Sequence, residues 1–148
     1  MGVRYFIEGP DEKTLIKALQ VPPAKEAPGK IDVFNVVQNE IKFSEIAKLD
    51  EDTVVFVCDT DAGNQNVLQK NISLVSSYKK LILWRQVRNL EEMLVRATDI
   101  KDVRTLTKSK TKREFKSDFR CMERSYLRKK LEEHKIDINK LWDITAIT

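Results

Sequence analysis

The sequence contains few of the residues that interrupt regular structure or build metal and disulfide clusters. Its 148 residues include four glycines, four prolines, two cysteines and one histidine. Structural zinc sites and disulfide frameworks need several closely spaced Cys or His residues, so neither is expected. No apolar run approaches the 18 residues of a membrane span, and the opening apolar stretch is too short for a signal peptide. We therefore expect a globular cytoplasmic protein with Cys58 and Cys121 as buried, reduced thiols.

Charge is abundant but unevenly distributed. Charged residues make up 34% of the chain, and the formal net charge is +4. Residues 1–100 contain 13 Lys/Arg and 15 Asp/Glu, whereas residues 101–135 contain 13 Lys/Arg and 6 Asp/Glu. A basic segment attached to a mildly acidic body favours a polyanionic partner such as nucleic acid.

Strand-like and helix-like segments alternate four times over the first 100 residues. The apolar, β-branched segments cover residues 3–7, 31–37, 54–58 and 81–87. The amphipathic segments between them cover residues 10–20, 38–49, 64–78 and 89–97. This alternation predicts an α/β fold with a mainly parallel, four-stranded, Rossmann-like sheet and helices on both faces.

The pattern changes after residue 105. Thr111 and Glu114 fit a capping box, which predicts a helix that begins near Lys112 and has one apolar stripe from Phe115 to Leu131. The last residues, 136–148, are expected to form a short helix. We therefore predict an α/β domain over residues 1–105 and a basic helical C-terminal extension over residues 106–148 that packs on it.

Three acidic residues follow the ends of predicted strands. Glu8 ends the first strand, and Asp59 and Asp61 end the third, within the stretch "VVFVCDTDAGN". Ligands of parallel sheets bind in the crevice at the carboxyl ends of the strands, so the three acids share one crevice if the first and third strands are neighbours. Residues i and i+2 of extended backbone face the same way, so Asp59 and Asp61 can share one ligand. Ionised carboxylates at such a position need a compensating cation, unless they only shape a turn or one of them is a nucleophile. Oxygen ligands of this kind suit Mg²⁺ or Mn²⁺.

The two motifs together resemble the Toprim family. "YFIEGPDEKTLIKAL" is similar to the opening strand, Glu-Gly turn and helix of that family, and "VVFVCDTDAGN" is similar to its Asp-x-Asp strand. The third aspartate that topoisomerase members usually have is replaced by Gly63. The chain also has no room for a strand-cleaving tyrosine domain and no zinc module of the primase kind. The resemblance therefore points to small nuclease-type members, such as the ribosomal-RNA maturases and the overcoming-lysogenization-defect nucleases.

The resemblance implies a set of site residues for Mg²⁺- or Mn²⁺-dependent phosphodiester cleavage. Asp59 and Asp61 would be metal ligands, and Glu8 either a ligand or the general base. Glu12 is a candidate further ligand, with the alternative that it only stabilises the start of a helix. Glu91 is a candidate further acid of the crevice, whereas its neighbour Glu92 fits a helix cap instead.

Basic residues are candidates for contacts to nucleic-acid phosphates. Two follow or end the fourth predicted strand, and four form the basic loop "KSKTKR". Phosphate contacts of this kind give affinity without sequence preference. The candidates are Arg85, Arg88, Lys108, Lys110, Lys112 and Arg113.

Two other functions remain open at this point. One is a non-catalytic nucleic-acid-binding or regulatory Toprim subunit, and the other is a phosphatase with Asp59 as nucleophile. The three acids favour the enzyme, because a binding module has no reason to keep mutually repelling carboxylates together. The sequence leaves open whether the substrate is DNA or RNA, and whether a protein partner or a second copy of the chain takes part.

Overall fold

The structure is a computed structural model that describes residues 2–21, 29–59, 65–86 and 89–147. The chain divides into two compact units. The sheet unit contains residues 2–9, 29–86 and 143–147 of the described chain, and the helical unit contains residues 10–21 and 89–142. Each unit is defined by itself. The expected domain boundary at residue 105 stays a prediction.

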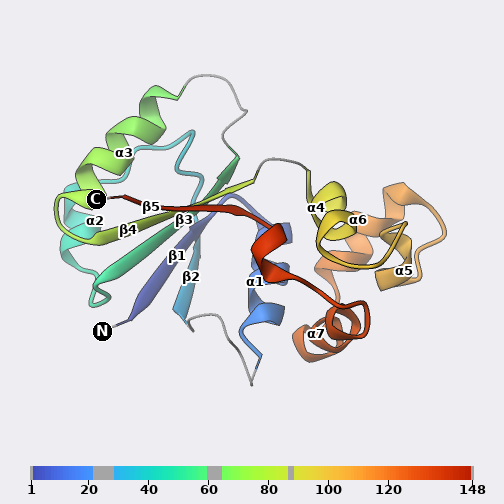
Figure 1. Cartoon of the computed structure of the whole chain (residues 1–148). Helices are drawn as coiled ribbons and strands as arrows, with labels where there is room; N and C mark the ends of the chain where they lie inside the picture. Colours follow the sequence, from blue (N-terminus) through green and yellow to red (C-terminus); the bar gives the residue numbers. More distant parts are fainter. Residues whose placement is uncertain (1, 22–28, 60–64, 87–88, 148) are drawn as a thin grey trace. The chain divides into compact units, whose positions relative to one another are not determined.

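The sheet unit is built on five strands (Figure 1). These are β1 (Val3–Ile7), β2 (Gly29–Val33), β3 (Thr53–Asp59), β4 (Lys80–Gln86) and β5 (Asp143–Ile147), in the spatial order β2-β1-β3-β4-β5. The first four are mutually parallel, as predicted, and β5 pairs antiparallel with β4. The sheet therefore has five strands rather than the predicted four, because the chain end forms an edge strand instead of a helix.

The central position of β3 explains its uninterrupted apolar run. A strand inside a parallel sheet is buried on both faces, and Val54 to Cys58 are all buried. On one face, side chains such as Phe6, Phe56 and Leu83 form a core with α2 (Phe43–Ala47) and α3 (Asn66–Ser76). These two helices lie beside the sheet in Figure 1. On the other face Tyr5 contacts Trp84 edge to face, with ring centroids 5.4 Å apart.

The chain leaves the second strand earlier than predicted. Strand β2 ends at Val33, and the Asn35 side chain accepts a hydrogen bond from the Val37 backbone N–H at 3.0 Å, which starts a turn. The predicted helix 38–49 is reduced to Phe43–Ala47. Buried Asn71 of α3 holds the connecting segment by accepting from Ile41 N–H and donating to two backbone carbonyls, all at 2.8 Å.

Arginine and glutamate form a buried ion pair at the amino ends of β1 and β3. The Arg4 guanidinium donates to the Glu51 carboxylate at 3.0 and 3.2 Å and to Asp32 at 3.0 Å. The Arg4 side chain is 17% exposed and that of Glu51 11%. The hydrogen bond from Arg4 lowers the pKa of Glu51, although burial acts in the opposite direction.

The helical unit packs short amphipathic helices around its own core. It contains α1 (Pro10–Leu19), α4 (Leu90–Ala97), α5 (Arg104–Thr107), α6 (Lys112–Arg120), α7 (Arg124–Glu133) and η1, a 3-10 helix (Ile138–Lys140). Helix α1 packs against α6 and α7, and α5 also contacts α6 and α7. Fully buried side chains of this unit include Leu15, Ile16, Phe115, Phe119, Leu127 and Leu131.

The apolar stripe predicted for one long helix is divided between α6 and α7. Thr111 caps α6 by accepting from Glu114 N–H at 3.2 Å, which confirms the predicted start. Helix α6 ends at Arg120, and Glu123 caps α7 by accepting from Tyr126 N–H at 2.9 Å. Cys121 lies in the turn between them and is exposed, so the prediction of a buried thiol was wrong there and correct for Cys58.

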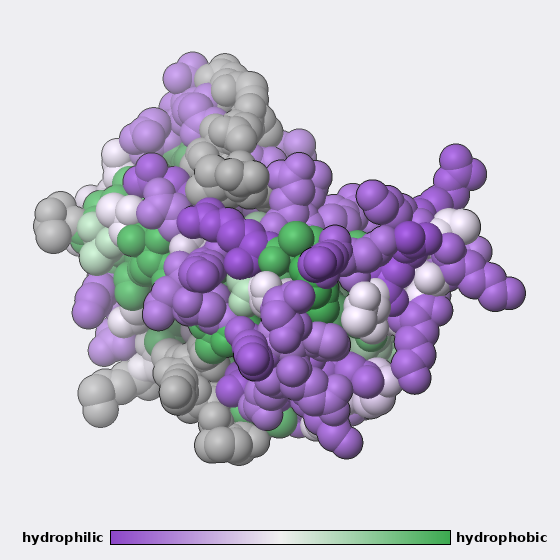
Figure 2. Space-filling model, turned by 45° about the vertical axis from the view of Figure 1, so that its right-hand side comes forward, coloured by the Kyte–Doolittle hydropathy of each residue, from purple (hydrophilic) through white to green (hydrophobic). Residues whose placement is uncertain are grey.

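The surface is dominated by polar side chains. Hydrophilic residues cover most of the face shown in Figure 2, with small apolar areas between them. Within the described residues, no helix is long and apolar enough to cross a bilayer.

Candidate functional site

Two of the predicted acids meet at the carboxyl ends of neighbouring strands. Strands β1 and β3 are parallel with Ile7 opposite Val57, so Glu8 follows β1 where β3 reaches Cys58 and Asp59. Glu8 Oε1 accepts a hydrogen bond from the Asp59 backbone N–H at 3.1 Å. The contact joins residues 51 positions apart in the sequence and holds the Glu8 carboxylate against the Asp59 backbone at the carboxyl ends of β1 and β3. The Asp59 carboxylate is close enough for its charge to act on Glu8.

The environment of Glu8 disfavours its charged form. Burial raises the pKa of Glu8, and the negative charge of Asp59 raises it further, while the hydrogen bond from Asp59 N–H acts in the opposite direction. A cation at this edge would favour the ionised form of both carboxylates. The donor set, two half-buried carboxylates, has the oxygen chemistry that Mg²⁺ and Mn²⁺ prefer.

Asp61 lies outside the described residues. Its expected position beside Asp59, two residues along an extended chain, stays a prediction. Among the residues that the structure describes, no group of three or more His, Cys, Asp or Glu side chains is arranged to hold a metal ion. Glu8 and Asp59 therefore supply a fitting pair, and the third predicted ligand belongs to the segment 60–64.

Glu12 and Glu91 both belong to the helical unit. Glu12 lies in the first turn of α1, and its charge raises the pKa of Arg120 slightly, after the larger contribution of Asp11. Glu91 lies in the first turn of α4. The predicted cap of that helix is confirmed, because Asn89 Oδ1 accepts from Glu92 N–H at 2.8 Å. The roles of Glu12 and Glu91 as metal ligands stay predictions.

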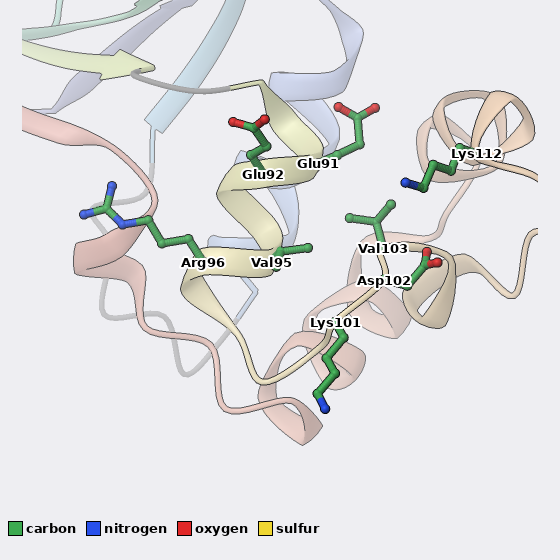
Figure 3. Close-up of a pocket in the computed structure, with 8 residues that line it drawn as sticks. All are labelled: Glu91, Glu92, Val95, Arg96, Lys101, Asp102, Val103 and Lys112. Carbon is green, nitrogen blue, oxygen red and sulfur yellow. The ribbon is translucent and has the colours of Figure 1, made fainter.

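Glu91 also lines a hollow of about 500 Å³ in the helical unit, which we call the mixed hollow (Figure 3). Three acidic and three basic side chains line it together with two valines. Lys112 extends into the hollow from the start of α6, and Glu91 and Val95 come from α4 (Figure 3). The opposite charges balance, so the mixed hollow has no preference for a strongly charged ligand. Its lining is Glu91, Glu92, Val95, Arg96, Lys101, Asp102, Val103 and Lys112.

The basic candidates fall in different places. Arg85 pairs with Cys58 in the register of β3 and β4, and its charge lowers the Cys58 pKa, although burial has the larger effect and raises that pKa to about 12. Arg85 therefore lies close to the end of β3, whereas Arg88 lies outside the described residues. Lys108, Lys110, Lys112 and Arg113 are all exposed. The predicted loop is shorter than expected, because Lys108 caps the end of α5 and Lys112 and Arg113 belong to the first turn of α6. We keep the name basic loop for residues 108–113.

The basic loop has a defined backbone. The Arg104 guanidinium donates to Asp102 at 2.6 Å and to the Lys110 carbonyl at 3.1 Å. Lys108 ends α5 in the left-handed conformation, with φ of 59°. The hydrogen bonds from Arg104 lower the pKa of Asp102 to about 2. The loop thus presents its lysines from a fixed scaffold.

Sequence reasoning missed a second hollow in the helical unit, also of about 500 Å³. Its charged lining consists of Lys13 and Lys17 from α1, Arg120 from the end of α6, Arg124 from the start of α7, and Glu123. We call it the basic hollow. Lys13 and Lys17 are four residues apart on one helix, a spacing visible in the sequence, but only the fold brings Arg120 and Arg124 to them.

Comparisons of this sequence with protein-family models, curated proteins and solved structures gave no match. The Toprim resemblance therefore rests on the two motifs quoted above and on the mainly parallel sheet that carries them.

Proposed function

We propose that this chain is a cytoplasmic Mg²⁺- or Mn²⁺-dependent nuclease of the Toprim type that cleaves phosphodiester bonds of DNA or RNA. The observation that carries the proposal is the hydrogen bond between Glu8 and the Asp59 backbone. It joins Glu8 of the Glu-Gly motif to Asp59 of the Asp-x-Asp motif, at the carboxyl ends of two neighbouring parallel strands.

The proposed roles follow from the position of each acid. Asp59 and Asp61 would hold the metal, which when bound supplies Lewis acidity and lowers the pKa of a coordinated water. Glu8 would either complete the ligand set or accept a proton from the attacking water. Its raised pKa suits the second role, because a general base works best when its pKa is close to the working pH.

The proposed substrate contacts are cationic. Arg85 lies beside the end of β3 and could reach a phosphate bound there. The basic loop would bind phosphates of the same strand in a sequence-independent way. A polyanionic substrate is consistent with the composition of the helical unit, whose chain segments contain 19 Lys/Arg and 13 Asp/Glu.

Incubation with labelled single- and double-stranded DNA and RNA, in Mg²⁺, Mn²⁺ or chelator, tests the proposal directly. We expect fragments with at least one substrate in the presence of metal and none with chelator. Binding without cleavage of any substrate in either metal would favour the regulatory subunit. Release of phosphate from a small monoester, with a trapped aspartyl-phosphate at Asp59, would instead establish the phosphatase.

A second test concerns the basic loop. Replacing Lys108, Lys110, Lys112 and Arg113 by Ala removes four candidate phosphate contacts. The slope of log K against log salt should become shallower by about 3 for single strands. The matched control replaces Lys42, Lys48, Lys80 and Lys129, four exposed lysines elsewhere in the chain. An equal change in both variants would mean that the loop acts only through net charge.

A further inference from the structure

The basic hollow combines four cationic side chains with one acid that is already engaged. Glu123 caps α7, and its hydrogen bonds from the Ser125 and Tyr126 backbone N–H groups lower its pKa. Its charge is therefore directed at the start of α7. In the described part of the chain, Lys13, Lys17 and Arg124 form no ion pair. Arg120 is paired with Asp11, and the charge of Arg124 contributes to lowering the Glu123 pKa. The excess positive charge of the hollow therefore comes chiefly from Lys13 and Lys17.

The walls of the basic hollow are held in place at both ends of α1. Arg120 donates to both carboxylate oxygens of Asp11, at 2.7 and 3.4 Å, near the start of the helix. Arg128 donates to the Leu19 carbonyl at 3.0 Å at its end. These contacts attach α1 to α6 and α7, so the three helices that carry the cations are held together before any ligand arrives. Such preorganisation lowers the entropic cost of binding.

The mixed hollow provides a comparison inside the same unit. Both hollows have a volume of about 500 Å³, which lies within the usual range for ligand sites. The mixed hollow has three acidic and three basic lining residues, whereas the basic hollow has one acidic and four basic ones. The volumes are therefore similar, and the charge of the lining distinguishes the two hollows.

We propose that the basic hollow binds the backbone phosphates of a nucleic-acid strand. Phosphate oxygens match ammonium and guanidinium donors, and several such contacts release condensed counterions from the strand. The same chemistry would suit a free polyphosphate or nucleotide. The strand is favoured because the basic loop of the same unit offers a second series of cations, which only an extended polyanion could use. That this polyanion is a nucleic acid rests on the proposed function.

The test uses the full-length protein and fluorescein-labelled 20-nucleotide strands, oligo-dT and oligo-U, in chelator so that cleavage cannot interfere. Fluorescence anisotropy gives the Kd at several salt concentrations. The variant is Lys13→Ala/Lys17→Ala, and the control is Arg96→Ala/Lys101→Ala, which removes two cations from the mixed hollow. Lys17 lies in the last turn of α1 and Arg96 in the last turn of α4. Variant and control therefore each lose one cation that interacts favourably with a helix dipole. Circular dichroism checks that both variants fold.

We expect the basic-hollow variant to bind about tenfold more weakly, with a salt slope shallower by about 1.4, the effect of two phosphate contacts on a single strand. The control should stay within about twofold of the wild type. Lys13→Arg/Lys17→Arg should restore binding, since it restores the charges. Equal weakening in variant and control, unchanged binding in both, or no strand binding by the wild type would each overturn the proposal.

Two further arms separate the possible failures. In the first arm, pyrophosphate or a nucleoside triphosphate competes with the labelled strand at micromolar concentration. If it competes more strongly than unlabelled strand at an equal phosphate concentration, the hollow is a free-polyphosphate site and the strand proposal is overturned. The same variants assayed with Mg²⁺ report on cleavage. A wild type that binds strands through the hollow but cleaves none would contradict the proposed nuclease and leave the hollow standing. If Lys13→Ala/Lys17→Ala cleaves strands and binds them normally, the proposed nuclease stands and the proposed role of the basic hollow is contradicted.

Discussion

The two ends of the strand pair β1 and β3 each place a glutamate, and the surroundings shift the pKa values of the two glutamates in opposite directions. At the amino ends, Glu51 is held by the Arg4 guanidinium, and its pKa is lowered. At the carboxyl ends, Glu8 lies beside Asp59, and burial together with that negative charge raises its pKa. The hydrogen bond and charge of Arg4 lower the pKa of Glu51, whereas burial and the charge of Asp59 raise the pKa of Glu8. Under the proposed function, a metal cation bound at the carboxyl ends would offset the repulsion between the two carboxylates.

The largest effect is expected when the carboxyl-end acids lose their charge. Asp59→Asn, Asp61→Asn and Glu8→Gln keep the shape of each side chain, so the variants should fold and bind strands. The rate of cleavage should fall on the order of 10²- to 10³-fold for each, because a transition-state interaction of a few kcal/mol is lost. Single-turnover assays measure this loss. Glu40→Gln, at an exposed carboxylate of the same unit, is the control. Rates within about threefold of the wild type in all three variants would contradict the assignment.

The second effect comes from removing the counterion at the amino ends. Arg4→Met should lower the free energy of unfolding by about 2 kcal/mol at pH 7, since the largely buried Glu51 carboxylate would lose the guanidinium that pairs with it. The lowered pKa means that the folded state loses this stabilisation as the pH falls from about 4.5 through the folded pKa. Urea unfolding between pH 3 and 7 should therefore show the difference between wild type and variant shrinking toward acid pH. A difference that does not depend on pH would indicate lost packing rather than the ion pair.

Metal should act only at the carboxyl ends. Mn²⁺ at several times its Kd should stabilise the wild type by about 1 kcal/mol, through preferential binding to the folded state. Thermal unfolding with and without Mn²⁺ measures this, and Asp59→Asn should lose the response while Arg4→Met keeps it. Since ionised carboxylates bind the metal, the response should grow as the pH rises from 4.5 through the raised pKa of Glu8. An equal response in Asp59→Asn would place the metal elsewhere.

The smallest effect concerns Glu8 and stability without metal. The raised pKa means that ionisation of Glu8 lowers the free energy of unfolding as the pH rises above about 4.5. Glu8→Gln should therefore gain less than about 1 kcal/mol at pH 7 and nothing below pH 4. Glutamine can still accept the hydrogen bond from the Asp59 backbone N–H. A loss of stability at pH 7 would show that the negative charge of Glu8 itself supports the fold.

Local patterns in the sequence predicted the parts of the fold that depend on neighbouring residues. The apolar run of β3, the cap of α4 by Asn89 and the cap of α6 by Thr111 each follow from a few adjacent residues. The rules for parallel sheets predicted that the carboxyl ends of the strands lie on one side of the sheet. That β1 and β3 are neighbours, which Glu8 needs to reach Asp59, was a condition that only the structure supplied. These are the features on which the candidate site depends.

Distant contacts account for the differences. The end of β2 depends on the Asn35 turn and on Asn71, which satisfies backbone groups 30 to 35 residues away. Residues 143–147 have the alternating pattern of an edge strand, but their partner β4 lies about 60 residues earlier. The basic hollow escaped prediction for the same reason, because α1 meets α6 and α7 only after about 100 residues of intervening chain.

The pairing of β5 with β4 has a consequence for biosynthesis. Strand β1 is translated before the helical unit, whereas β5 of the same sheet is translated only after it. Until then β4 is an edge strand, with the unpaired backbone groups that favour association with other chains. Helix α1 likewise waits for α6 and α7. Neither unit can be completed until residues 143–147 or helices α6 and α7 have been made, so nascent chains are expected to depend on chaperones or on fast late folding.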